Sequence, residues 1–251
     1  MDTLACIKRV PDTGARMRLT DDGQRIDTSG LGFTVSPHEE CAVEAAIGAV
    51  EDHGGTATVL TLGPEAATEQ LRSALAMTAD QAVLLETDGE EWSPRETAAA
   101  IADAARDVSP DLLLFGVESA DAANAQVGAR VAERLDVPFV TGVSSLAVQE
   151  DGVVAGREVA GGEERYELEL PAAVAVKEGV NEPRYASMRG KMRARKQEIP
   201  RHDPARPTLE GRLAKRRLET PEDDDGDAER LGEGADAVPA VVDLLDELEV
   251  A

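Results

Sequence analysis

The sequence is poor in several features that assign a protein to a common functional class. It has only two cysteines, Cys6 and Cys41, and they form no Cys-X-X-Cys pair. No apolar stretch approaches the ~20 residues that a membrane-spanning helix needs. The first residues do not resemble a secretory signal. We therefore expect a cytoplasmic protein in a reducing compartment that is not embedded in a membrane.

Signatures of enzyme chemistry are also missing. The three histidines, His38, His53 and His202, have no metal-ligand spacing with the cysteines or with one another. The sequence contains no Gly-X-Ser-X-Gly, His-Glu-X-X-His, Gly-X-Gly-X-X-Gly or P-loop pattern. We therefore predict no catalytic residue and no metal site.

Positive charge is scarce, because 50 acidic residues face 26 basic ones and give a net charge of -24. Only five of the basic residues are lysines. Such a surface repels nucleic acid, so we expect no nucleic-acid partner. Few lysines with many acidic residues are typical of proteins that stay soluble in concentrated salt, and we interpret the composition as halophilic.

What is present is an alternation of strand-like and helix-like segments before residue 136. Strands are predicted over 4–10, 56–62, 81–86 and 112–115. Two Ser-Pro-X-Glu patterns, Ser36 to Glu39 and Ser93 to Glu96, each predict a helix that begins with a capping box. This alternation predicts parallel strands with helices on both faces of the sheet.

After Pro138 the sequence becomes rich in β-branched residues. Four stretches predict strands, separated by hairpin signals at Asp151-Gly152 and Gly161-Gly162, and they cover residues 139–148, 153–159, 165–170 and 172–176. We expect them to extend the sheet. The predicted fold class is therefore α/β, a three-layer Rossmann-like nucleotide-binding fold with a mostly parallel sheet, a β-hairpin extension and a C-terminal arm.

The segment from Leu112 to Leu135 is the strongest candidate for a ligand site. An apolar strand ends at Gly116, small polar residues follow from Asp121, and a helix opens near Asn124 to Val127. Free amides at a helix start attract anions, and ligands of open α/β sheets bind at the carboxyl ends of strands. An ordinary turn without a ligand explains the spacing equally well. Lys8, near the end of the first strand, faces either such a ligand or solvent.

The last quarter of the chain has a distinct charge pattern. Residues 184–217 hold 12 Lys and Arg against three acidic residues, which favours a negatively charged partner. Tyr185 is the only aromatic residue there, so a protein fits better than RNA, although a solvated basic turn stays open. Residues 219–236 predict an acidic linker, and an apolar stripe from Val238 to Leu248 predicts a short helix that docks on another subunit or on its own domain. We place domain boundaries at 1–200, 201–236 and 237–251.

Six segments together resemble the β subunit of electron transfer flavoproteins, including its Fix-type branch. They span about residues 3–200 and read CIKRVPDT, SPHEECAVEAA, LTLGPEAATEQLRSALAMTADQAVLLE, GVESADAANAQVGARVAERLDVPFVT, REVAGG and LPAAVAVKEGVNEPRYASMRGKMRARK. The resemblance implies a non-catalytic carrier subunit that binds an adenine nucleotide, usually AMP, beside an α subunit that holds the redox FAD. The heterodimer then passes electrons from acyl-CoA or other dehydrogenases to a membrane quinone oxidoreductase.

The resemblance also implies site residues at matching positions of this chain. For the nucleotide they are Cys6 beside the base, Ser36 at a helix cap, Gly63 after its strand, and Asp121, Ala122, Asn124, Ala125, Gln126 and Val127 around the phosphate. For partners, Glu158 matches a glutamate that contacts the α subunit. Arg184 and Met188 lie in a segment that resembles the family's recognition loop. In that loop, Met188 matches a leucine that enters a pocket of an acyl-CoA dehydrogenase.

Some residues depart from the family pattern, and two alternatives stay open. Ser36 stands where the family usually has Asn, Thr78 replaces a Gly, and Arg189 replaces a Pro. Within the family, the alternative is an electron-bifurcating subunit with FAD in this site and NADH as donor. From another class, a stand-alone ATP-binding sensor shares the α/β core but carries Gly-rich triphosphate loops, which this sequence lacks.

Overall fold

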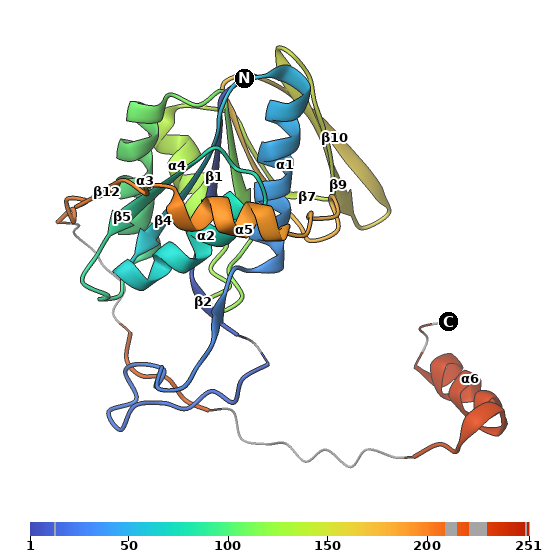
Figure 1. The fold of residues 1–251 in the computed structure, drawn as a ribbon. Helices are drawn as coiled ribbons and strands as arrows, with labels where there is room; N and C mark the ends of the chain where they lie inside the picture. The colour runs from blue at the N-terminus through green and yellow to red at the C-terminus, as the bar shows by residue number, and fades with distance from the viewer. Residues whose placement is uncertain (13, 209–214, 221–229, 249, 251) are drawn as a thin grey trace. The chain divides into compact units, whose positions relative to one another are not determined.

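The first part of the chain is built around a seven-stranded parallel sheet (Figure 1). The computed structural model describes residues 1–12, 14–208, 215–220, 230–248 and 250. The chain divides into two compact units, Met1–Arg18 with Thr28–Ala214 and Leu19–Asp27 with Lys215–Ala251. Parts of the predicted basic segment (209–214) and of the predicted acidic linker (221–229) lie outside the described residues. The first unit confirms the predicted α/β class.

The order of strands in this sheet brings early and late parts of the chain together. From one edge to the other the strands are β12 (Arg201–His202), β5 (Gln81–Glu86), β4 (Ala57–Gly63), β1 (Thr3–Ile7), β6 (Leu112–Gly116), β11 (Ala172–Val176) and β7 (Phe139–Val143). Every residue of β1 and β11 is buried. Apart from Thr3, whose hydroxyl donates to the Ala46 carbonyl oxygen, both strands are apolar, as expected of strands that are covered on both faces.

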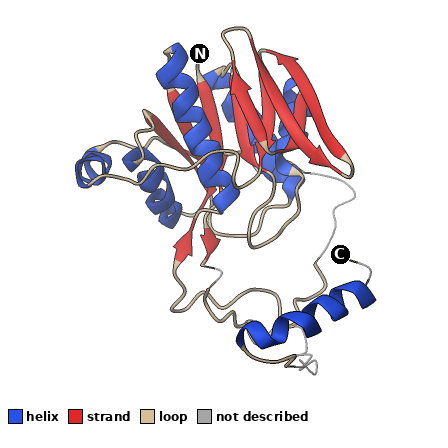
Figure 2. Cartoon of the chain, turned by 90° about the vertical axis from the view of Figure 1, so that its right-hand side faces the viewer, coloured by secondary structure: helices blue, strands red, loops and turns tan. Residues whose placement is uncertain are grey.

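Helices lie on both faces of the sheet and give the predicted three layers (Figures 1 and 2). On one face α1 (Pro37–His53) and α2 (Thr68–Ala76), the latter preceded by the short helix η1 (Glu65–Ala67), share a hydrophobic core with the sheet, and α5 (Met188–Lys196) packs on α2. On the other face α3 (Pro94–Val108) and α4 (Val127–Leu135) form a second core cluster.

The prediction that the first strand extends to residue 10 is wrong. Strand β1 stops at Ile7, and Val10–Pro11 forms a separate strand, β2, that pairs antiparallel with β3 (Phe33–Thr34). The apolar residue Val10 suggested continuity, but its burial comes from this small ladder. The chain therefore leaves the sheet at Lys8, the point at which a ligand of the sheet edge is expected.

The prediction that all strands after Pro138 extend the main sheet is also wrong. Of the strands formed by the four predicted stretches, only β7 and β11 enter it, and β11 inserts between β6 and β7, whereas the later strand β12 joins the opposite edge. The intervening strands β8 (Ser145–Val148), β9 (Gly152–Val159) and β10 (Gly162–Glu169) form a separate antiparallel sheet (Figure 2). The continuous burial of β11 and the largely exposed pattern of β10 reflect this difference, since only an internal strand is covered on both faces.

The two Ser-Pro-X-Glu patterns both start helices, but only one forms the predicted capping box. At α3 the Ser93 hydroxyl accepts a hydrogen bond from the Glu96 N–H, and the Glu96 carboxylate accepts one from the Ser93 N–H. At α1 the Ser36 side chain makes no capping hydrogen bond. The capping prediction for Ser36 is therefore wrong, and the residue is used elsewhere.

The second unit contains the predicted C-terminal helix, α6 (Val238–Glu247), preceded by a single turn, η2 (Gly234–Ala237). Its large apolar residues are exposed in the described structure: Val238, Val241, Val242, Leu244, Leu245 and the following Leu248. In the same unit, the Leu218 N–H donates a hydrogen bond to the Gly23 carbonyl oxygen over 2.7 Å. None of the helices among the described residues is long and apolar enough to span a membrane.

Candidate nucleotide site

The residues predicted to bind a nucleotide come from three neighbouring strands and the segments that follow them. Cys6 in β1 is in register with Leu60 of β4 and Phe115 of β6. Gly63 ends β4, and the loop from 117 to 126 follows β6. Because parallel strands end at the same edge of a sheet, the fold brings these residues to one carboxyl edge.

Cys6 contributes a neutral surface to this edge. Its side chain is buried, and burial, followed by the nearby charge of Glu39, raises the pKa of the thiol far above its usual range. A thiol in this state is neither a nucleophile nor a metal ligand. It is suited to packing beside an uncharged group such as a purine base.

Ser36 links the start of α1 to the loop after β6. Its hydroxyl accepts a hydrogen bond from the Ala120 N–H over 3.0 Å. The approach of α1 to this loop is close, since a Cβ on Gly116 would lie 2.8 Å from Cγ of Glu39 and 3.0 Å from the Glu39 backbone nitrogen. Glycine at 116 is therefore required by the contact between α1 and β6.

A charged cluster of Lys8, Asp121 and Glu39 lies beside this loop. The Lys8 ammonium group lies 2.6 Å from one Asp121 carboxylate oxygen and 2.7 Å from the other, and 3.4 Å from the Ser119 hydroxyl. The Lys8 N–H donates a hydrogen bond to the buried Glu39 carboxylate over 3.0 Å. Burial raises the pKa of Glu39 to about 8, although backbone hydrogen bonds from Lys8 and Ser36 act in the opposite direction.

The backbone of the loop is shaped for an anion. Ala123 and Ala125 adopt positive φ angles of 46° and 49°, and Gln126 then precedes the first residue of α4. Alternation of left-handed and right-handed residues turns successive N–H groups toward one concave side, where anions bind. The first amides of α4 also lack intrahelical acceptors. The loop residues Asp121, Ala122 and Asn124 are exposed, whereas Val127 and Gly128 at the start of α4 are half-buried and buried.

Two residues that the resemblance did not supply complete the site. Arg130, one turn into α4, donates from Nε and Nη2 to the Gln126 side-chain oxygen over 3.1 and 2.8 Å. Lys8 is the second residue. From the sequence alone, its position near the end of a strand is compatible with contact to a ligand or to solvent. The signal for Arg130 was its spacing of four residues from Gln126 on a helix, which places the two side chains on one face.

The predicted partner residues lie on other elements than the predicted nucleotide residues. Glu158 is exposed on the antiparallel sheet, in register with Glu163 of the adjacent strand. Arg184 contacts α1, and Met188 is the first residue of α5. The two sets of predicted residues are therefore carried by different elements of the first unit.

Comparison with known proteins identifies the family. The family described as electron transfer flavoprotein domain matches residues 25–207. The chain belongs to this family. It is 36% identical over 201 residues to the electron transfer flavoprotein subunit beta of Bacillus subtilis (strain 168), which covers 79% of this chain and 77% of the relative. It is 38% identical over 200 residues to the subunit beta of Mycobacterium leprae (strain TN), with 77% and 75% covered.

The chain is also similar to a protein with a different name. A caffeyl-CoA reductase-Etf complex subunit, CarD, of Acetobacterium woodii is 34% identical over 204 residues, which cover 79% of this chain and 77% of the relative. The resemblance to electron transfer flavoprotein β subunits is thus confirmed, and this chain is a β-type subunit of that family.

Proposed function

We propose that the chain binds one AMP at the carboxyl edge of β1, β4 and β6 and works with an α subunit that holds FAD. The observation that carries this proposal is the loop from Ser119 to Gln126, in which left-handed residues lead to the start of α4 and the Ser119 and Asp121 side chains contact the Lys8 ammonium group. The residues present fit a phosphate, because cationic and N–H donors surround the loop.

Each predicted nucleotide residue has a role in this proposal. Ser36 holds the loop through Ala120, and Lys8 neutralises Asp121, whose carboxylate would otherwise repel a phosphate. Gly63 ends its strand without a side chain, which leaves room at the edge, and Cys6 packs beside the adenine base. Asp121, Ala122, Asn124, Ala125, Gln126 and Val127 form the phosphate-binding turn.

The proposed heterodimer carries electrons from acyl-CoA or similar dehydrogenases to a membrane quinone oxidoreductase. The FAD, when bound to the α subunit, supplies the redox chemistry. This chain is then a carrier subunit rather than a catalyst, and its own residues bind the nucleotide and the partner proteins. Glu158 and the exposed apolar stripe of α6 contact the α subunit, whereas Met188 contacts the dehydrogenase.

The test is the nucleotide content of the heterodimer. The chain is co-expressed with its α subunit in concentrated salt, and the purified complex is denatured so that released AMP and FAD can be quantified. We expect one AMP and one FAD per heterodimer. A Lys8→Met variant should retain FAD but lose most of the AMP, whereas Arg165→Met, an exposed arginine on the antiparallel sheet, should retain both. A wild-type heterodimer without any nucleotide in this chain would overturn the proposal.

A second candidate function is an electron-bifurcating subunit with FAD in this site and NADH as donor. The similarity to a subunit of a caffeyl-CoA reductase-Etf complex supports this second candidate. The same measurement separates the two functions, because two FAD and no AMP per heterodimer would assign the loop from Ser119 to Gln126 to a flavin. Rapid reduction of the complex by NADH would then follow.

A further inference from the structure

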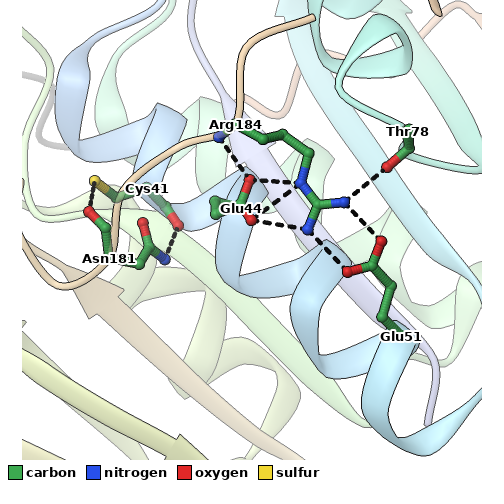
Figure 3. Close-up of polar contacts among 6 residues, drawn as sticks. All are labelled: Cys41, Glu44, Glu51, Thr78, Asn181 and Arg184. Carbon is green, nitrogen blue, oxygen red and sulfur yellow. Dashed lines mark hydrogen bonds and ion pairs between the residues drawn. The ribbon is translucent and has the colours of Figure 1, made fainter.

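The segment after β11 runs along one face of α1 with a constant offset of 140 residues (Figure 3). The Glu178 N–H donates to Nδ1 of His38 over 2.6 Å, and Nδ2 of Asn181 donates to the Cys41 carbonyl oxygen over 2.9 Å. The third contact joins Arg184 to Glu44. Residues 38, 41 and 44 are spaced by three on a helix, so they form one ridge that holds the segment.

Arg184 makes the densest set of contacts on this ridge. Its Nε and Nη2 donate to the Glu44 carboxylate over 2.8 to 3.0 Å, and its Nη1 and Nη2 donate to the Glu51 carboxylate over 2.6 and 2.9 Å. Nη1 also donates to the Thr78 hydroxyl over 3.1 Å, which adds the second residue after α2 (Figure 3). We call Arg184, Glu44, Glu51 and Thr78 the Arg184 clamp.

The clamp is strong by its chemistry. The hydrogen bonds to Glu51 and then to Glu44 raise the pKa of Arg184, and the hydrogen bond from Arg184 lowers the pKa of Glu51. The Glu44 side chain is only 14% exposed, so solvent screens that ion pair weakly. A planar guanidinium group fits two carboxylates in this way, and a lysine ammonium group does not.

Beyond the clamp, α5 is fixed by its buried face. The Ser187 hydroxyl caps the helix by accepting from the Gly190 N–H over 3.0 Å. Gly190 and Ala194 are buried, and a Cβ on Gly190 would collide with the Ala76 carbonyl oxygen of α2. Arg193 also donates to the Leu75 carbonyl oxygen over 3.1 Å. The opposite face of α5 is consequently turned away from the protein.

That outer face is apolar and ringed by positive charge. Met188 and Met192, four residues apart on one side of α5, are 75% and 60% exposed, and Tyr185, which precedes the helix, is 98% exposed. We call these three residues the docking face, and its exposed basic rim consists of Arg189, Lys191, Arg195 and Lys196. In a chain of net charge -24, such a rim fits a partner whose apolar pocket has an acidic border.

We propose that Arg184 is a positioning residue that holds the docking face in its binding orientation and does not itself contact the partner. This inference rests on the proposed function, in which the face binds a flavoprotein dehydrogenase. Tyr185 follows Arg184 directly, and Met188 is four residues later. Without the clamp, residues 181–187 sample several positions. The measured affinity for the dehydrogenase is then the intrinsic affinity multiplied by the fraction of chains in the binding orientation.

The experiment uses the complete heterodimer with four variants. Arg184→Ala removes the clamp, Arg184→Lys keeps the positive charge without the planar guanidinium group, and Met188→Ala truncates the docking face itself. Arg206→Ala is the matched control, because Arg206 also bridges two glutamates, Glu90 and Glu96, and its side chain is 32% exposed against 30% for Arg184. The probes are purified short-, medium- and long-chain acyl-CoA dehydrogenases, each reduced with its acyl-CoA substrate.

Two measurements are made on each heterodimer. The first is the KM and kcat for electron transfer from the dehydrogenase. The second is amide hydrogen exchange over residues 181–192. For Arg184→Ala we expect a KM raised about tenfold with kcat within a factor of two, and faster exchange confined to this segment. Arg184→Lys should have an intermediate KM, and Arg206→Ala should leave both KM and segment exchange unchanged.

The outcomes separate the clamp from the proposed function. If the wild type accepts electrons and Arg184→Ala has an unchanged KM, the positioning role is wrong. If Arg206→Ala raises KM as much as Arg184→Ala does, general destabilisation explains the effect and the clamp is also overturned. If no dehydrogenase reduces the wild-type heterodimer, the proposed electron donor is wrong, and this failure is visible without any variant.

Discussion

The two Ser-Pro-X-Glu segments begin helices in the same way but are used differently. At Ser93 to Glu96 both side chains bond back to the start of α3, and the box serves only the helix. At Ser36 to Glu39 the serine hydroxyl bonds to Ala120 in the loop after β6, and the glutamate accepts from Lys8 at the end of β1. The same four-residue pattern thus caps one helix and, at the other, contacts the loop after β6 and the end of β1.

The surroundings of each helix start explain this difference. The start of α1 lies against β6 at a glycine, and the Ala120 N–H after β6 and the Lys8 N–H after β1 come within reach of Ser36 and Glu39. Glu96 is buried too, but the Arg206 guanidinium group lies 3.0 Å from it. Burial acts to raise the pKa of Glu96, and the hydrogen bonds from Arg206 and Ser93 outweigh it and lower that pKa to about 2. A local motif therefore predicts where a helix begins, and the neighbours decide what its side chains bind.

The largest effect that would sharpen this comparison is expected for Gly116→Ala. The new Cβ collides with Glu39 at the start of α1, and overpacking of this kind costs about 2 kcal/mol. The control is Gly48→Ala within α1, where a Cβ meets no atom within 4 Å and the helix gains about 0.5 to 1 kcal/mol. Denaturant unfolding measures both. A neutral Gly116→Ala would show that α1 does not need its close approach to β6.

The next largest effect is a pH dependence of opposite sign at the two glutamates. Glu39 keeps its proton up to pH 8 in the native state but loses it near 4.5 when unfolded, so its contribution to stability is complete below pH 4.5 and is lost as pH rises to 8. Glu96 behaves inversely, and its contribution is present above pH 4.5 and lost as pH falls toward 2.

Comparison of the two glutamine variants tests this contrast. Glu39→Gln should remove on the order of 2 kcal/mol of the decline in unfolding free energy between pH 5 and 8. Glu96→Gln should leave that range unchanged and flatten the profile below pH 4.5. Unfolding curves at a series of pH values give both slopes. Identical profiles for the two variants would remove the distinction between the segments.

A smaller effect is expected from the serines. Ser93→Ala removes a complete cap and should cost about 1 kcal/mol of stability without a change in nucleotide content. Ser36→Ala should also cost about 1 kcal/mol, because Ser36 is buried and the Ala120 N–H loses its acceptor. Unlike Ser93→Ala, it should lower the AMP retained by the heterodimer. Thermal unfolding and nucleotide release measure the two properties, and equal AMP retention by the two variants would contradict the comparison.

The smallest stability effect is expected for Lys8→Met. The Lys8 side chain is 43% exposed, so its ion pair with Asp121 contributes roughly 0 to 1 kcal/mol. Its loss should instead weaken AMP binding about tenfold, because an unpaired Asp121 repels the phosphate. Isothermal titration with AMP on nucleotide-free heterodimer measures this loss. Unchanged AMP affinity would show that the Ser36 segment supports the loop without the help of Lys8.

The sequence predicted most elements of the first unit because their hydrophobic periods are clear. The strand over 81–86 and the apolar residues 112–115 lie where they were expected. The sequence did not predict that β11 inserts between β6 and β7, since strand order depends on long-range packing. Thr78 is a further example. The resemblance indicates that the family usually has glycine at this position. The structure shows the reason, because Thr78 has a positive φ of 91°, which a β-branched residue adopts at an energetic cost.

The sequence by itself determined the α/β class, the helix starts and the family. These follow from local periodicity, capping residues and motif order, which need no knowledge of distant contacts. The tertiary structure decided which groups meet: Lys8 with Asp121, Ser36 with Ala120, and Arg184 with Glu44 and Glu51. Each of these pairs joins residues more than 80 positions apart, and only packing of the helices on the sheet brings them within hydrogen-bonding distance.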